Sequence, residues 1–94
     1  MSLVQRFSAV VLDGHKGLAF EVPFDPRSRW SISEVSLRPG RRGYHVRGTV
    51  NKIEFESVVV PRTKRFFVLV TDEMRSKGRL RDGSKVTVSL RPAD

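Results

Sequence analysis

Apolar and polar residues alternate along most of the chain with the two-residue period of β-strands. The alternation predicts a first strand over residues 5–12 and a second over residues 17–22, joined at the turn-forming pair Asp13-Gly14. A clean alternation over residues 85–91 predicts the last strand. The hydrophobic pattern therefore indicates a mainly β protein.

The clearest hairpin joins residues 44–50 to residues 53–60 through Asn51-Lys52. A two-residue turn there places Tyr44 opposite Val59 and Arg47 opposite Glu56. The apolar pairs then fall on one face and the charged pair on the other, so the register is self-consistent. Gly48 opposite Phe55 predicts a kink covered by the phenyl ring.

Helical structure is expected only in short pieces. Asp25-Pro26 predicts an N-cap and a first helical residue, so one turn should run to about Trp30. Residues 72–78, after a buried strand at 65–71, predict a second helix that ends at Gly78. Residues 31–37 fit a helix and a strand equally well. Trp30 fits either a plug at one end of a barrel or the mouth of a pocket.

Together these elements predict a single domain over residues 1–94. Its fold class is mainly β: a small closed or partly open antiparallel barrel of six to seven strands with one or two short helices. Closing the sheet removes exposed edges, which otherwise invite aggregation.

Composition narrows the class of protein. The chain has no cysteine, which excludes disulfides and cysteine nucleophiles and favours a reducing cytoplasm. No apolar run is long enough to span a membrane, so no membrane partner is expected. The net charge of +8 makes this a basic protein, as nucleic-acid-binding domains often are.

No pattern points to catalysis, a cofactor or a metal. His15 and His45 lack carboxylates at ligand spacing, and Glu54 and Glu56 share a face on which Arg47 pairs with Glu56. The chain contains no G-x-S-x-G elbow and no phosphate-cradling glycine-rich loop.

Basic clusters are the best candidate site. The predicted register brings the loop before Tyr44 next to the turn after Val60, so two clusters should meet there. The resulting nucleic-acid or anion patch comprises Arg38, Arg41, Arg42, Arg47, Arg62, Lys64 and Arg65. Tyr44 or Phe66 would add base stacking if exposed. The alternative is a solubilising rim with both rings buried. A third cluster, at residues 75–81, is expected to be a solvated helix end.

A family resemblance rests on short, mainly structural motifs. They are Phe7-Ser8-Ala9-Val10, Phe20-Glu21-Val22-Pro23, Val46-Arg47-Gly48-Thr49-Val50-Asn51 and Phe67-Val68-Leu69-Val70, continued by Leu80, Asp82, Val86 and Val88. With them the chain resembles DUF1905, a small bacterial family of unknown function whose members look like six- or seven-stranded barrels. The resemblance implies a bacterial cytoplasmic setting and no activity. Two departures are the reversed order of Asp82-Gly83 and an apparent insertion at residues 31–42.

These observations rank three functions. The first is a non-enzymatic binding module for an unidentified protein partner or a small ligand at the barrel mouth. The second is weak, sequence-nonspecific nucleic-acid binding through the arginine-rich patch. The third is an enzyme of unrecognised type.

Overall fold

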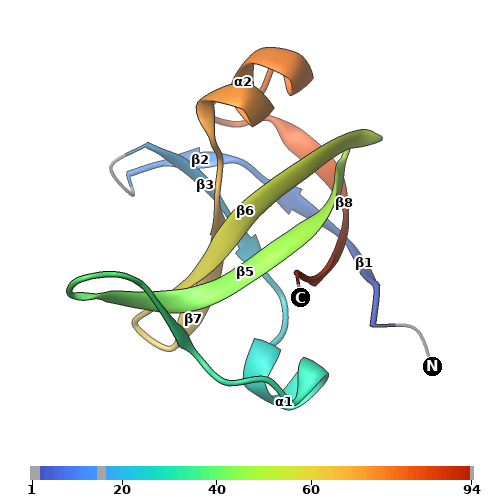
Figure 1. Cartoon of the computed structure of the whole chain (residues 1–94). Helices are drawn as coiled ribbons and strands as arrows, with labels where there is room; N and C mark the ends of the chain where they lie inside the picture. The colour runs from blue at the N-terminus through green and yellow to red at the C-terminus, as the bar shows by residue number, and fades with distance from the viewer. Residues whose placement is uncertain (1–2, 15–16, 94) are drawn as a thin grey trace.

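The computed structural model describes residues 3–14 and 17–93, which form one curled antiparallel sheet with two short helices (Figure 1). The mainly β prediction is confirmed. The elements, in chain order, are β1 Gln5–Val10, β2 Leu12–Asp13, β3 Leu18–Val22, α1 Pro26–Trp30, β4 Val35–Arg38, β5 Arg41–Val50, β6 Ile53–Arg62, β7 Arg65–Leu69, α2 Asp72–Gly78 and β8 Lys85–Pro92.

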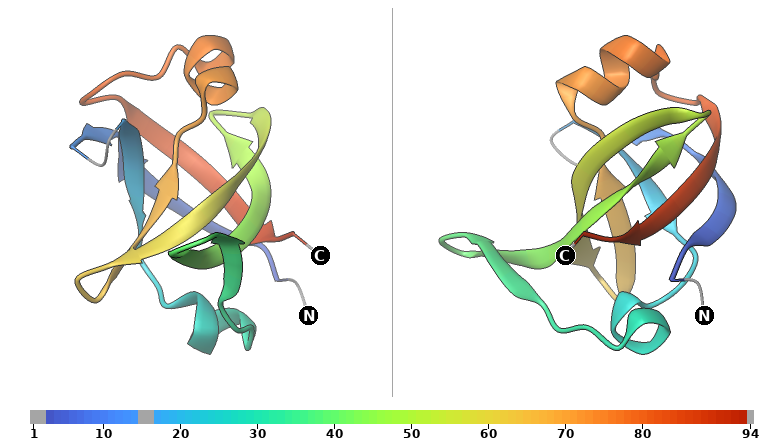
Figure 2. Two further views of the ribbon diagram at one scale, coloured as in Figure 1. Left: turned by 60° about the vertical axis from the view of Figure 1, so that its left-hand side comes forward. Right: turned by 45° about the vertical axis from the view of Figure 1, so that its right-hand side comes forward.

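The strands follow the order β1-β8-β5-β6-β7-β3-β2, with β4 paired to β5 outside this path. β1 and β2 stand at opposite ends of that order, yet only Val11 separates them in the chain. The Val11 N–H donates to Ser84 O (2.8 Å), and the Gly83 N–H donates to Val11 O (2.7 Å). The two ends of the curled sheet are therefore joined by the covalent chain at Val11, whereas β1 and β3 do not pair (Figure 2).

Aromatic side chains occupy the side where β1 and β3 are unpaired. The Phe7 ring lies 6.3 Å from Phe20 and 6.0 Å from Phe24, measured between centroids. Phe24 in turn meets Trp30 edge-on at 5.1 Å. The Trp30 ring is buried, and its Nε1–H donates to Leu3 O (2.7 Å). Of the two alternatives for Trp30, the structure shows the plug.

The central hairpin has the predicted register. Tyr44 pairs with Val59, Arg47 with Glu56 and Val50 with Ile53. Asn51 and Lys52 both adopt positive φ (49° and 71°), as a two-residue hairpin turn requires. Both strands run further than predicted, because β5 begins at Arg41 and β6 ends at Arg62. This extra length carries charged residues past the barrel wall.

Both helices begin as predicted. The Asp25 carboxylate accepts from the Arg27 N–H (2.9 Å), and the Thr71 hydroxyl accepts from the Met74 N–H (3.1 Å). The predicted bounds of α2 are confirmed, because the helix ends at Gly78. The next residue, Arg79, is the left-handed C-cap (φ 52°), and its N–H donates to Arg75 O. The ambiguous segment contains strand β4. Within the described residues, neither helix is long or apolar enough to cross a membrane.

Candidate functional site

Two hairpin ends carry most of the predicted basic residues to one side of the sheet. In the β4–β5 hairpin, Arg38 pairs with Arg41. In the β6–β7 hairpin, Arg62 pairs with Arg65. The β5–β6 register joins the two hairpins, so their ends lie beyond the same end of the β5–β6 ladder (Figures 1 and 2). We define the basic patch by the residues at these ends: Arg38, Arg41, Arg42, Arg62, Lys64 and Arg65.

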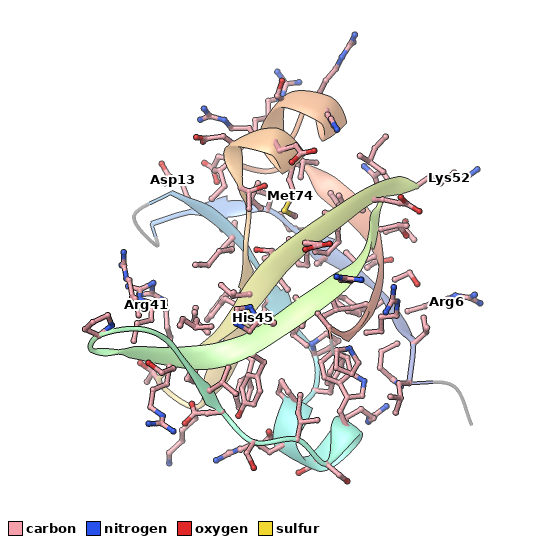
Figure 3. The ribbon with its side chains drawn as sticks, in the orientation of Figure 1. Arg6, Asp13, Arg41, His45, Lys52 and Met74 are labelled. Carbon is pink, nitrogen blue, oxygen red and sulfur yellow. The ribbon has the colours of Figure 1, made fainter. Side chains whose placement is uncertain are left out.

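A hollow of about 290 Å³ lies within the basic patch. Arg41, Arg42 and Arg62 all line it, together with Glu34 and Pro61. Arginines from two separate hairpins thus border one small concavity. Figure 3 shows Arg41 at the outer end of the β4–β5 hairpin.

Carboxylates neutralise the patch only in part. The Arg42 Nε lies 4.0 Å from Glu34 Oε1, and an Arg65 terminal nitrogen lies 3.8 Å from Glu21 Oε1. Both distances exceed those of a good charge-assisted hydrogen bond, and the four side chains are a third or more exposed. Among the described residues, no ion pair involves Arg38, Arg41, Arg62 or Lys64. The patch therefore keeps a strong positive potential.

Arg62 holds a donor that the described protein atoms do not satisfy. Its Nε is buried and has no hydrogen-bond partner there. A buried N–H without an acceptor costs free energy, and a charged donor costs more than a neutral one. Because Arg62 lines the hollow with two other arginines, an anion seated there would supply the missing acceptor once the Arg62 side chain turned its Nε toward it.

Arg47 lies apart from the basic patch. Its Nε is 3.2 Å from Glu56 Oε1, so Arg47 forms the predicted cross-strand ion pair. It lines a different and larger groove of about 610 Å³, on the outer face of β5 and β8 below α2. The structure thus brings six of the seven predicted residues together and leaves Arg47 on the sheet wall.

The two candidate stacking residues are not available to a base. Tyr44 and Phe66 are only 2% and 9% exposed, and their ring centroids lie 6.5 Å apart. Burial and the nearby Glu34 carboxylate raise the pKa of the Tyr44 hydroxyl. The Arg27 guanidinium covers Phe66 at 5.8 Å and also bonds Asp25. Any contact to nucleic acid here is to phosphates rather than to base faces.

The other candidates carry no site. His45 is exposed on β5 (Figure 3), and His15 lies outside the described residues. In the described part of the chain, no cluster of histidine and carboxylate side chains could hold a metal ion. In the third basic cluster, Arg75 and Lys77 pair with Asp72 and Glu73 on the exposed surface of α2.

Two features of the patch were not predicted from the sequence. Glu34 enters it only because residues 31–37 fold back to place β4 beside β5, and the local pattern left that path open. Lys64 adopts positive φ (66°) at the tip of the β6–β7 hairpin, in a two-residue turn with Thr63. Two residues separate Arg62 from Arg65, just as Asn51-Lys52 separates Val50 from Ile53. This spacing was the signal from which the turn could have been predicted.

The comparisons agree with the resemblance in the sequence. The family model described as a domain of unknown function, DUF1905, matches residues 7–90. The matched region runs from β1 to β8 and includes the whole basic patch. No curated protein matches the chain.

Proposed function

The chain belongs to the DUF1905 family, and we propose that this member binds the phosphate backbone of nucleic acids through its basic patch, without reading sequence. The observation that carries the proposal is the hollow lined by Arg41, Arg42 and Arg62, in which the Arg62 Nε has no partner among the described residues. Arginine suits such a role because its planar donors match phosphate oxygens.

Charge and position support a polymeric anion. The patch spreads over two hairpins, with Arg38 on the β4–β5 hairpin and Lys64 in the turn of the β6–β7 hairpin. Several cations can therefore meet successive phosphates, and each contact releases counterions. The net charge of +8 adds a long-range attraction that speeds association.

Side-chain chemistry supports backbone contact over base contact. Single-strand binders commonly stack bases on exposed aromatic rings, whereas Tyr44 and Phe66 are buried here. A duplex, with its higher phosphate density, is the better target. A reducing bacterial cytoplasm would give the protein access to such a ligand.

Fluorescence anisotropy with labelled duplex and single-stranded oligonucleotides tests the proposal. At low salt we expect the duplex to bind more tightly. Arg41→Glu with Arg65→Glu should abolish binding, and the matched reversal Arg81→Glu with Lys85→Glu, outside the patch, should cost much less. Equal losses from the two double variants would reduce the effect to net charge and overturn the proposal. No binding at low salt would overturn it as well.

A small ligand is the second candidate. It rests on a different part of the structure, at the α1 end of the sheet, and is independent of the basic patch.

A further inference from the structure

A second concavity, of about 440 Å³, lies between the end of β8, the start of β5 and the segment that connects α1 to β4. Ligand-binding pockets in proteins have volumes of this order. Most of its wall is apolar, and two of the apolar side chains are well exposed, Leu3 at 52% and Val35 at 43%. The residues that matter for the argument are Leu3, Ile32, Val35, Tyr44, Arg91 and Pro92.

Tyr44 forms part of this wall and, like Arg62, holds a buried side-chain group without a hydrogen-bond partner among the described residues. Tyr44 is only 2% exposed, and its hydroxyl has no hydrogen-bond partner among the described residues. A phenol in the core normally finds an acceptor, because leaving it unpaired costs free energy that phenylalanine would not. The hydroxyl remains protonated at neutral pH, since burial raises the pKa of Tyr44. It is therefore an unpaired donor, which a ligand reaches by displacing the side chains that cover it.

Charge at the rim selects the ligand class. Arg91 lines the concavity, is exposed, and makes no ion pair within the described part of the chain. A guanidinium beside an apolar wall favours a carboxylate attached to an apolar body. The carboxylate would meet Arg91 while the body covers Leu3, Ile32 and Val35.

We propose that this concavity binds a small apolar carboxylic acid, held by Arg91 at its rim and by the Tyr44 hydroxyl at its wall. The concavity shares no lining residue with the hollow of the basic patch, so this proposal is tested independently of nucleic-acid binding.

The single tryptophan provides the readout. Trp30 donates to Leu3 O, and Leu3 lines the concavity, so a ligand that covers Leu3 changes the surroundings of the indole. Sodium hexanoate, octanoate and decanoate are titrated while Trp30 fluorescence is followed, with octan-1-ol as the neutral counterpart of octanoate. We expect a saturable change with the carboxylates and weaker binding of the alcohol.

Three variants locate the site. Tyr44→Phe should fold with unchanged or higher thermal stability, because the hydroxyl has no partner to lose, yet bind the carboxylate about three- to tenfold more weakly. Arg91→Gln should weaken binding similarly. Lys85→Gln, which removes a cation from the same strand outside the concavity, should leave affinity unchanged.

Three results would overturn the inference. They are no saturable change with any of the three carboxylates, unchanged affinity in Tyr44→Phe, and a Tyr44→Phe variant that loses thermal stability. The last would show that the hydroxyl serves the fold.

Discussion

Gly48 of β5 lies directly against the backbone of Ser89 in β8. A methyl group at Gly48 would stand 1.8 Å from the Ser89 carbonyl oxygen, which no real Cβ atom does. Glycine therefore lets β5 pass β8 closely enough to curl the sheet while β5 also pairs with β6. The Phe55 ring is buried opposite, as expected for a covered kink, but the close approach of the paired β8 backbone is what demands glycine.

Replacing Gly48 with alanine should lower the free energy of unfolding by about 3 kcal/mol or more, because the atom in the way belongs to the backbone and cannot rotate aside. Urea unfolding followed by Trp30 fluorescence measures the loss. Thr49→Ala, at the next and half-buried position, is the control and should change stability by about 1 kcal/mol or less. A Gly48→Ala variant as stable as the control would show that β8 can move away.

Two lysines occupy backbone conformations that favour glycine. Lys52 and Lys64 have φ of 71° and 66° at equivalent positions of the two hairpin turns, and only Lys64 belongs to the basic patch. Arg41 and Lys52 lie at opposite ends of the β5–β6 hairpin (Figure 3). Each lysine costs the fold about 1 kcal/mol relative to glycine.

Lys64→Gly and Lys52→Gly should therefore both raise the free energy of unfolding, each by about 0.5–1 kcal/mol. Only Lys64→Gly should weaken duplex binding, since only Lys64 would contact phosphate. Denaturant melts and anisotropy titrations of the two variants separate the effects. Equal affinities of the two variants for duplex would remove Lys64 from the interface.

The stabilisation provided by the first turn of α1 should depend on pH. The side chain of Arg27 hydrogen-bonds Asp25 and holds the pKa of that carboxyl below its ordinary 3.8. A lowered folded-state pKa means that the contribution of Asp25 to stability is present above the unfolded value and disappears as pH falls through the folded one. Asp25→Asn keeps a capping side chain but cannot titrate.

The wild type should accordingly be more stable than Asp25→Asn at neutral pH, and the difference should vanish in acid. Unfolding curves of the two proteins at neutral and at acidic pH measure this difference, and an NMR titration of the Asp25 carboxyl measures its pKa. A stability difference that persists well below pH 3.8 would mean that the cap acts by shape rather than by charge.

Local patterns were sufficient for most of the fold. The alternation on either side of Asn51-Lys52 set the register from Tyr44–Val59 to Val50–Ile53, and that register in turn placed the two basic clusters together. Capping residues located the starts of α1 and α2. In each case the determining residues are neighbours in the chain.

Features that depend on distant strands were not predictable. The left-handed C-cap after α2 is Arg79 rather than a glycine, and Arg79 is followed by Leu80, which is buried in the core. The pairing of β4 with β5 and the position of Glu34 depend on how residues 31–37 return to the sheet. Arg47 fell outside the patch because β5 is extended and carries Arg47 away from Arg41, to the sheet wall where it pairs with Glu56.

The salt dependence of duplex affinity tests the central claim most directly. Up to six phosphate contacts predict a slope of log K against log salt of about −5. The triple variant Arg41→Gln/Arg62→Gln/Arg65→Gln should reduce its magnitude by about 3. Lys52→Gln/Arg81→Gln/Lys85→Gln, with the same net charge, should keep most of the slope. Equal slopes in the two triple variants would contradict the claim that the basic patch is where the phosphate backbone binds.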